Sequence, residues 1–461
     1  MDPITRPIRV IYDTKSWEYR SKTWLAYLGV FGLACGDTLR YTIGWTGMGI
    51  WSGVLFIATL WMLARSQPME TIKRIPWSMI ALYAALLLSA VLSNYWLFSV
   101  GAVVVTAITG TFGLWLAHAF DWRHLLRIFA NVSRFVLGSS LLFEFYAAAI
   151  LHGRILPFFK NFEGDVVPAK AYYWTQGNLF NGDRIQGIVG NANLLAYVSM
   201  IALIVFAVEF AIIGTSRWIS VASLASAVLC LALSKSVGIG FAVAAVLVSA
   251  GVSLAAEGQP KEVRHRYYRV AWIAASVFAI AVWLLRGEIF TALGKSPDMT
   301  GRTMIWKKVL GLISERPFEG YGWLSYWMPG VEPYEGLVVI NKVSYYQAHN
   351  AFLDMWLQGG ILALLIFIVM LFITFVKLWQ LAVRHTSSLY LWPILVFIGL
   401  IVQNFTESRL LSELGWVLLT LFVIKVRDPL EMLEPLGRSP KRVRLLYRGL
   451  RQSRSQLRKD R

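Results

Sequence analysis

Long apolar stretches, separated by shorter polar connections, run along most of the chain. About twelve of them approach or exceed the length that a helix needs to cross the hydrocarbon layer of a membrane. They lie at residues 24–37, 46–64, 76–93, 98–118, 126–150, 190–213, 217–233, 237–255, 269–286, 350–376, 388–404 and 410–425. The pattern predicts an all-α, polytopic integral membrane protein with about twelve transmembrane helices.

Two of the polar connections are much longer than the others, at 151–189 and 287–348. Within the second one, apolar side chains recur with the spacing of one helix face. They are Ile305, Trp306, Val309, Leu310 and Ile313, while Lys307, Lys308 and Ser314 fall on the opposite face. We therefore expect the large loop to contain an amphipathic helix that lies outside the membrane span, on the membrane surface.

Basic residues are distributed unevenly between the two alternating sets of connections. One set includes both termini and also holds Arg65, Lys73, Arg74, Arg123, Arg127, Arg217, Lys261, Arg264, Arg266, Arg269, Lys377 and Arg384. The short connections of the other set hold only Arg40, Lys235 and Arg409. Because cytoplasmic loops are enriched in Lys and Arg, we predict that both termini are cytoplasmic and that both long loops lie on the outer face.

The chain thus divides into a cytoplasmic basic N-terminus (1–23), a polytopic membrane domain (24–426) and a cytoplasmic basic tail (427–461). No short apolar stretch with a small-residue cleavage site precedes the first span, so we expect no cleaved signal peptide. The tail reads as a solvated basic arm, and whether it binds a partner stays open.

Composition supports this organisation. Hydrophobic residues make up 57% of the chain and charged residues 15%, which excludes an ordinary soluble protein. The formal net charge of +18 follows the topology and suits contact with anionic membrane lipids, so we predict no nucleic-acid partner. The two cysteines, Cys35 and Cys230, lie in apolar runs, and neither a disulfide nor a cysteine metal site is expected.

Polar clusters gather where the topology places span ends on the outer face. The motif RIQGIVGNAN (184–193) puts Arg184 and Asn193 at the start of a span, where glycines allow close backbone approach and a helix N-terminus attracts anions. The motif LSKSVGIG (233–240) puts Lys235 between two spans. An interfacial anchor explains the first cluster equally well, and a tight turn explains the second.

A third cluster opens the amphipathic helix. In GRTMIW (301–306), Arg302 occupies the first turn, next to Trp306 one turn later. A cation in the first turn is unfavourable to the helix dipole. Either binding of an anionic ligand by Arg302 or a salt bridge to an acidic side chain accounts for this placement.

Two more clusters lie near the end of the chain. AHNAF (348–352) puts His349 and Asn350 at the start of a span, where polar groups cost free energy unless they have a partner or a water cavity. QNFTESR (403–409) brings Asn404, Glu407 and Arg409 to the corner between the last two spans. An interfacial hydrogen bond and a local Glu407–Arg409 pair are the simpler explanations.

Placed together at one face, these residues suit a diphosphate substrate. Arginine binds phosphate bidentately and stabilises charge on a departing diphosphate, and His349 supplies a base that works near neutral pH. No outward carboxylate cluster suited to Mg²⁺ is seen, so we predict no metal and no cofactor. We assign catalysis to His349, Arg302 and Arg184, and substrate binding to Lys235, Asn193, Trp306, Asn350, Asn404, Glu407 and Arg409.

RIQGIVGNAN, GRTMIW followed by GYGW, and AHNAFLDMWLQGG occur in that order. With the topology of nearly the whole chain, these motifs resemble the O-antigen ligase and polymerase family (WaaL/Wzy type). The charged GDTLR segment, from Asp37 to Arg40, is most similar to the ExoQ-like exopolysaccharide polymerases within that family.

The resemblance implies a metal-independent glycosyltransferase that makes bacterial cell-surface polysaccharide. It would transfer a glycan from an undecaprenyl-diphosphate carrier to a hydroxyl of an acceptor glycan or lipid, at the outer face of the cytoplasmic membrane. Arg184 and Arg302 would bind the diphosphate, and His349 would act as general base. Membrane lipids and other polysaccharide-assembly proteins are the further partners implied.

Three questions stay open at the level of sequence. A polymerase and a ligase need the same diphosphate-binding residues and the same general base, so these residues do not distinguish the two activities. A flippase for the same lipid-linked glycan fits twelve spans equally well, although it should place charges at mid-membrane depth, where the main candidate is Arg134. A scaffold that docks partners through residues 287–348 is the third reading.

Overall fold

The structure is a computed structural model. It describes residues 16–66, 72–73, 75–158, 172–284, 288, 301–340, 343–385 and 387–427. Most of the predicted cytoplasmic N-terminus and tail, and parts of both long loops, lie outside the described residues.

Each predicted apolar segment coincides with a helix in the described residues. These helices are α1 (Trp17–Ala34), α2 (Gly36–Arg65), α4 (Trp77–Leu92), α5 (Trp96–Ala119), α6 (Trp122–Phe145), α7 (Ala192–Ile213), α8 (Arg217–Ser234), α9 (Val237–Ala256), α10 (Lys261–Leu284), α13 (Ala351–Arg384), α14 (Leu391–Gln403) and α15 (Glu413–Lys425). The remaining elements are η1 (Tyr146–Ile150), α12 (Arg302–Glu315), β1 (Val339–Ile340), β2 (Val343–Ser344), η3 (Ser388–Tyr390) and η4 (Arg409–Leu411).

The chain is an all-α, polytopic integral membrane protein. Among the described residues, seven helices are long and apolar enough to cross a membrane, namely α2, α5, α6 with its π-helical end, α7, α8, α9 and α13. Helices α4 and α14 are apolar but shorter. The count of about twelve spans therefore stays a prediction.

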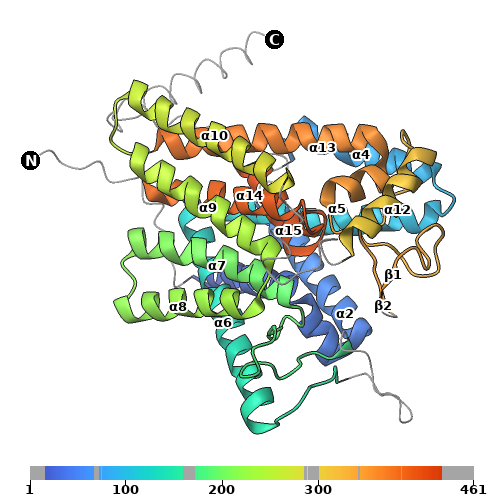
Figure 1. The fold of residues 1–461 in the computed structure, drawn as a ribbon, viewed down its shortest axis with the longest axis horizontal. Coiled ribbons are helices and arrows are strands. Elements are labelled where there is room, and N and C mark those ends of the chain that lie inside the picture. Colours follow the sequence, from blue (N-terminus) through green and yellow to red (C-terminus); the bar gives the residue numbers. More distant parts are fainter. Residues whose placement is uncertain are drawn as a thin grey trace, which may run out of the picture.

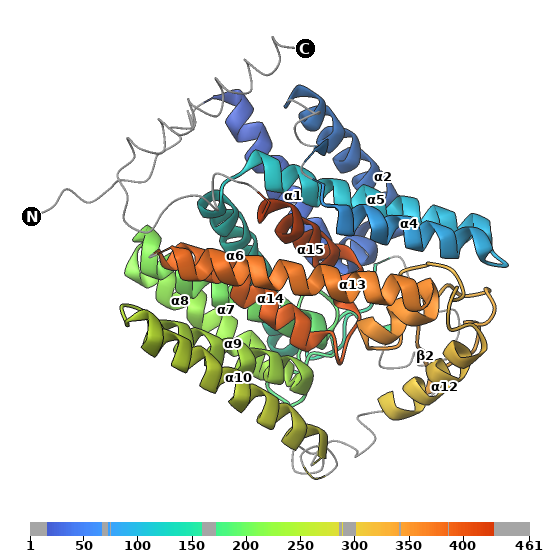
Figure 2. The same ribbon diagram turned by 90° about the horizontal axis from the view of Figure 1, so that it is seen from above.

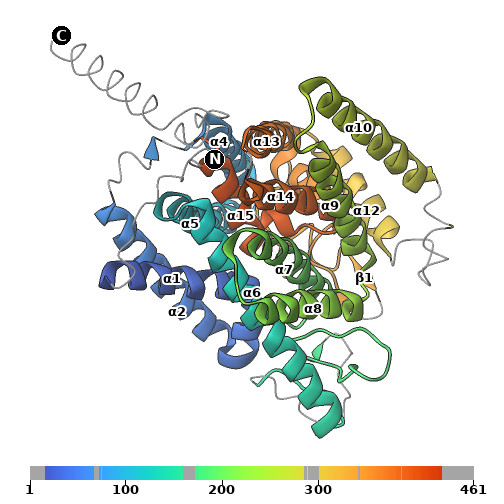
Figure 3. The same ribbon diagram turned by 90° about the vertical axis from the view of Figure 1, so that its left-hand side faces the viewer.

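Helices α14 and α15 form the middle of the bundle. Figure 3 shows them surrounded by α5, α13, α9 and α7, and the packing of these helices against one another agrees. Every residue of α15 from Leu414 to Lys425 is buried. A helix that is apolar on all sides reaches its best environment in the interior of a bundle, and this explains the central position of such a short helix.

Helix α13 runs the length of the bundle, with α12 and the β1–β2 hairpin at its N-terminal end (Figures 1 and 2). It is interrupted at Gly360, where φ is 73° and ψ is 177°. The segment 317–323 docks into this break. The amide of Ile361 donates to the carbonyl of Pro317 at 2.9 Å, and the amide of Tyr321 donates to the carbonyl of Leu357 at 2.9 Å.

The docked segment is also fixed from its other side. Hydroxyls of α4, of the turn after it and of α5 donate to its carbonyls, in the pairs Ser89–Glu319, Ser93–Tyr321 and Ser99–Trp323. The motif GYGW is therefore held between the break in α13 and the helices α4 and α5, and we call this arrangement the clamp. This clamp sets the position of the loop that carries α12.

Replacing Gly360 with alanine is expected to destabilise the protein. A Cβ at this position would lie 2.0 Å from the carbonyl oxygen of Phe318, and the positive φ is itself unfavourable for a residue with a Cβ. Backbone strain alone costs roughly 1–3 kcal/mol, so the apparent melting temperature of the detergent-solubilised protein should fall by several degrees. Gly251→Ala in α9 is the control, because nothing lies within 4 Å of its added Cβ. A melting temperature unchanged in both variants would contradict the clamp.

Helix α12 is the amphipathic helix expected from the sequence, but its apolar face packs against the protein. Ile305, Val309 and Ile313 are buried in a small core with Trp327, Tyr334 and Leu357. Leu310, placed on the apolar face from the sequence, is instead 47% exposed. The expected contact of this face with the membrane surface is therefore replaced by intramolecular packing, because the segment after α12 supplies a matching apolar surface.

Candidate active site

Glu407, in the connection between α14 and α15, lies at the centre of a polar network. Its Oε1 accepts a hydrogen bond from Nη2 of Arg302 at 3.0 Å and from Nδ2 of Asn193 at 2.9 Å. Its Oε2 lies 3.0 Å from Nδ1 of His349. Glu407 thus joins the first turn of α12, the first turn of α7 and the residue before the cap of α13.

The carboxyl group of Glu407 is 4% exposed. Burial by itself raises its pKa, but His349, Arg302 and Arg409 together outweigh burial and lower the pKa to about 2. Glu407 is therefore ionised at neutral pH. An ionised carboxylate only accepts hydrogen bonds, so the proton of a neutral His349 ring resides on Nδ1. The lone pair of Nε2 is then available to take a proton.

Arg184 belongs to the same network through Asn193. Its Nη2 donates to Oδ1 of Asn193, and its Nε donates to the carbonyl of Ser234 at 2.7 Å. The hydroxyl of Ser236 also donates to Oδ1 of Asn193, at 3.0 Å. Burial lowers the pKa of the Arg184 guanidinium more than the nearby Glu407 raises it. The three residues predicted to be catalytic are thus brought together around Glu407.

The backbone that carries Arg184 is held by the end of α6. Glu144, which is fully buried, accepts hydrogen bonds from the amides of Gln186 at 2.8 Å and Gly187 at 2.7 Å. Gly187 has a φ of 62°, and a Cβ there would lie 2.6 Å from the hydroxyl of Ser140. The close backbone approach expected for these glycines is confirmed at this position, and only glycine fits it.

His349 has a φ of 50°, a left-handed conformation that is uncommon outside glycine and costs free energy. Asp354 holds the backbone in this shape. It is fully buried, and its carboxylate accepts from the amide of Ala348 and from Nε1 of Trp327, both at 2.9 Å, and from the hydroxyl of Ser408. Since Ala348 precedes His349 and Ser408 follows Glu407, Asp354 fixes the spacing between the imidazole and the carboxylate.

Three of the residues predicted to bind substrate hold the scaffold of the site. Oδ1 of Asn350 caps α13 by accepting from the amides of Phe352 and Leu353 at 3.0 and 3.2 Å. Nε1 of Trp306 donates to the carbonyl of Ala348 at 3.0 Å, which fixes α12 beside His349. Asn404 is fully buried and accepts from the amide of Leu410 at 2.9 Å.

Lys235 and Arg409 lie at the margin of the network. Lys235 is exposed at the end of α8, and its ammonium donates to the carbonyl of Gly182. Nη1 of Arg409 donates to the hydroxyl of Tyr326 at 3.2 Å and to Glu413 at 3.4 Å. The local Glu407–Arg409 pair considered from the sequence does not form, because each side chain has other partners. The salt bridge considered for Arg302 does form, and its partner is Glu407.

Several buried polar atoms at the site make no hydrogen bond among the described residues. They are Nε of Arg302, Nε of Arg409 and Oε1 of Gln347. Buried polar atoms are nearly always satisfied in a folded protein. The Nε–H groups of Arg302 and Arg409 are therefore buried beside the network without a partner among the described residues.

Sequence reasoning missed Glu144 and Asp354 as organisers of the site. Glu144 carried a usable signal, since a carboxylate inside a predicted span is rare and needs a partner. Asp354 carried no such signal, because it lies five residues after His349 near the start of a predicted span, where a polar residue is ordinary. Its actual contact is with the backbone before His349, which no helical spacing predicts.

Comparison with known proteins agrees with the motifs. Residues 193–368 match the model of a family described as O-antigen ligase, a range that contains Asn193, Arg302 and His349. The chain is also similar to the exopolysaccharide production protein ExoQ of Rhizobium meliloti (strain 1021), with 29% identity over 116 residues. This alignment covers 23% of the chain and 27% of ExoQ, so it spans about a quarter of that relative.

Proposed function

We propose that this chain is an ExoQ-like member of the O-antigen ligase and polymerase family, as the two matches support, and that it transfers glycan from an undecaprenyl-diphosphate carrier to an acceptor hydroxyl. The coarser assignment, a polysaccharide polymerase or ligase, follows from the family. The donor, the acceptor and the roles of single residues are the proposal. One observation carries it: Glu407 holds a histidine and an arginine, each at 3.0 Å, from segments far apart in the chain.

In the proposed reaction, the acceptor oxygen attacks the anomeric carbon of the donor sugar. The bond from this carbon to the diphosphate oxygen breaks, and the diphosphate leaves with the electron pair. The proton of the acceptor hydroxyl passes to Nε2 of His349. Glu407 orients the ring through Nδ1 and stabilises the imidazolium that forms, which is the usual task of a carboxylate behind a catalytic histidine.

The diphosphate would bind to guanidinium groups. The buried Nε of Arg302 has no hydrogen-bond partner among the described residues, and Arg184 lies on the other side of Asn193 from Glu407. These two arginines carry two positive charges against the one negative charge of Glu407. A positive, partly buried network stabilises negative charge that develops on a leaving diphosphate, in the place where other enzymes use a metal ion. Lys235 and Arg409 at the margin add further positive charge.

The predicted topology places this chemistry on the outer face of the cytoplasmic membrane. In this proposal, about twelve spans cross the membrane, residues 1–23 and 427–461 are cytoplasmic, and the loops 151–189 and 287–348 are outside. The acceptor and the lipid diphosphate would then meet at headgroup depth, where His349 precedes its helix. Other polysaccharide-assembly proteins remain proposed partners.

The lipid-linked glycans of a strain that lacks this protein test the proposal directly. Mass spectrometry of the undecaprenyl-linked pool should show glycans that accumulate at the outer leaflet. Single repeat units would identify a polymerase, and long finished chains would identify a ligase. Precursors retained at the cytoplasmic leaflet would contradict both and favour the transporter. That alternative is not favoured here, since Arg134, the mid-span charge it needed, is paired with Glu209 of α7.

A further inference from the structure

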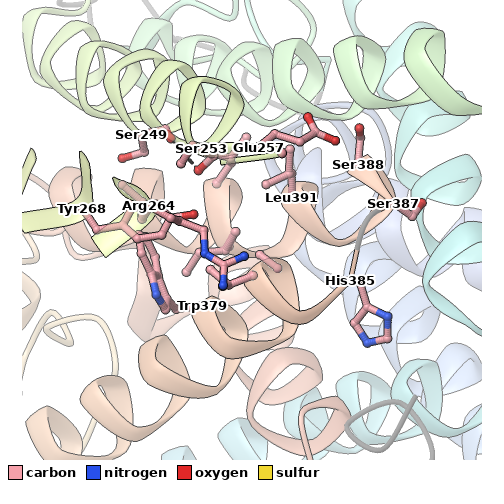
Figure 4. A pocket seen from close by; sticks show the side chains of 17 residues that line it. Ser249, Ser253, Glu257, Arg264, Tyr268, Trp379, His385, Ser387, Ser388 and Leu391 are labelled. Atoms are coloured by element: carbon pink, nitrogen blue, oxygen red, sulfur yellow. Dashed lines mark hydrogen bonds between the residues drawn. The ribbon is translucent and has the colours of Figure 1, made fainter. Parts of the chain in front are cut away.

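A cavity lies at the opposite end of the bundle from the candidate active site. Helix α9 begins beside Ser236 and α13 begins after Asn350, both at the site, and α14 ends there. The cavity is formed where α9 and α13 end and where α14 begins, with α10 as its outer wall (Figure 4). Its volume of about 110 Å³ is several times the roughly 10–15 Å³ that a single water needs on the same measure.

The lining is mostly polar at the helix ends, and farther along it combines Ser249 and Ser253 of α9 with apolar residues of α14. At the helix ends it presents the side chains of Glu257, Arg264, His385, Ser387 and Ser388. Deeper in, α14 contributes Leu391, Ile394, Leu395 and Ile398, whose spacing forms one continuous apolar stripe on that helix. The stripe reaches about 10 Å into the bundle at 1.5 Å per residue. A cavity with polar groups at its opening and an apolar stripe along one wall suits a ligand that has a polar head and an apolar chain.

The mouth holds two opposite charges that do not neutralise each other. Arg264, in the first turns of α10, points into the space between the helices, and Glu257 ends α9 (Figure 4). No salt bridge joins these two side chains in the part of the chain that the structure describes. Tyr268 and Trp379 pack edge to face, with ring centroids 4.5 Å apart, and so keep α10 against α13. Among the residues that the structure describes, the guanidinium of Arg264 therefore stays beside the cavity without a salt bridge.

We propose that this cavity binds a zwitterionic aminophospholipid of the phosphatidylethanolamine type. The phosphate accepts charge-assisted hydrogen bonds from Arg264, and the primary ammonium donates to Glu257. An acyl chain lies along the stripe from Leu391 to Ile398. Basic pockets between helix ends commonly hold lipid headgroups, but the carboxylate here adds a requirement for a cation with donor hydrogens. Phosphatidylglycerol lacks that cation, and the choline of phosphatidylcholine has no N–H to donate.

Lipid retention measured by native mass spectrometry tests the proposal. The purified full-length chain is exchanged into detergent micelles with equal amounts of phosphatidylethanolamine, phosphatidylglycerol and phosphatidylcholine of identical acyl chains. The protein is expected to retain phosphatidylethanolamine about tenfold more than either competitor, the ratio expected for one additional charge-assisted hydrogen bond. Equal retention of the three lipids by the unmodified protein would overturn the proposal, whatever the variants do.

Two variants assign the contacts. Glu257→Gln should remove the preference for phosphatidylethanolamine over phosphatidylglycerol, whereas Arg264→Gln should lower the retention of all three lipids. Glu262→Gln and Arg266→Gln are matched controls, because both side chains are exposed on α10 and do not line the cavity. A preference that survives Glu257→Gln contradicts the ammonium contact. Displacement of bound lipid by soluble glycerophosphoethanolamine at equal concentration would show that the headgroup alone is the ligand and overturn the lipid assignment.

Discussion

Replacing His349 with alanine is expected to lower the rate of glycan transfer by about 10²- to 10⁴-fold, the range for loss of a general base. The proton of the acceptor hydroxyl then has no acceptor at the position of Nε2. The measurement is transfer from undecaprenyl-diphosphate-linked glycan by the purified chain in proteoliposomes, at equal amounts of protein. His349→Gln should be equally inactive, because glutamine can donate to Glu407 in place of Nδ1 but is not a base.

His152→Ala is the matched control for this prediction. His152 has the same φ of 50° as His349, so both substitutions remove a histidine from a left-handed backbone position. His152 is exposed, and its Nδ1 lies 3.1 Å from the carbonyl oxygen of Ala148. The transfer rate should stay unchanged in this variant. Transfer at the wild-type rate by His349→Ala would exclude the imidazole as the general base and leave its contact with Glu407 purely structural.

Replacing Arg302 with glutamine is expected to reduce transfer by about 10²- to 10³-fold, the usual effect of removing one donor to a charge that develops in the transition state. The loss should appear mainly in kcat, because the charge on the diphosphate grows as the anomeric bond breaks. Arg302→Lys should recover part of the rate. Lysine keeps the charge but lacks the planar fork that binds two phosphate oxygens.

A second substitution separates binding of substrate from support of Glu407. If Arg302 acts only by pairing with Glu407, then Glu407→Gln should remove the whole effect of Arg302→Gln in the double variant. If Arg302 also contacts the diphosphate, the double variant should be slower than Glu407→Gln alone. Arg154→Gln is the control, since Arg154 lies exposed after α6 and away from the network. A wild-type rate for Arg302→Gln would exclude the phosphate contact.

The arrangement of the site explains why single motifs are weak signals in this chain. Arg184, Arg302 and His349 each have an ordinary structural explanation when considered alone. They become one site because Glu407 and Asn193 connect them, and these two residues lie 214 positions apart in the chain. The carboxylate of Glu407, with a pKa of about 2, holds Arg302 and His349 directly and Arg184 through Asn193, because its negative charge offsets the positive charge gathered there.

Most of the fold was predictable from the sequence, since a bilayer imposes a length and an apolar composition on every span. The positions of the apolar helices, the amphipathic character of residues 302–315 and the grouping of the polar motifs all follow from pattern and charge. Helix α10 begins at Lys261, well before the predicted apolar stretch. Its first turns are charged, and a hydropathy pattern detects only the apolar part of a helix, so the charged turns were not predicted.

What the sequence determined by itself was therefore the membrane class, the positions of the apolar helices and the candidate residues, because each of these depends on local composition and spacing. Tertiary structure alone decided which candidates touch. It assigned Asn350, Trp306 and Asn404 to the scaffold, packed α12 against the protein and made Asp354 the support for His349. The site itself depends on contacts between segments far apart in the chain, such as the 3.0 Å approach of His349 to Glu407 across 58 positions. Free energies of packing and hydrogen bonding fix such contacts only when the whole bundle has assembled.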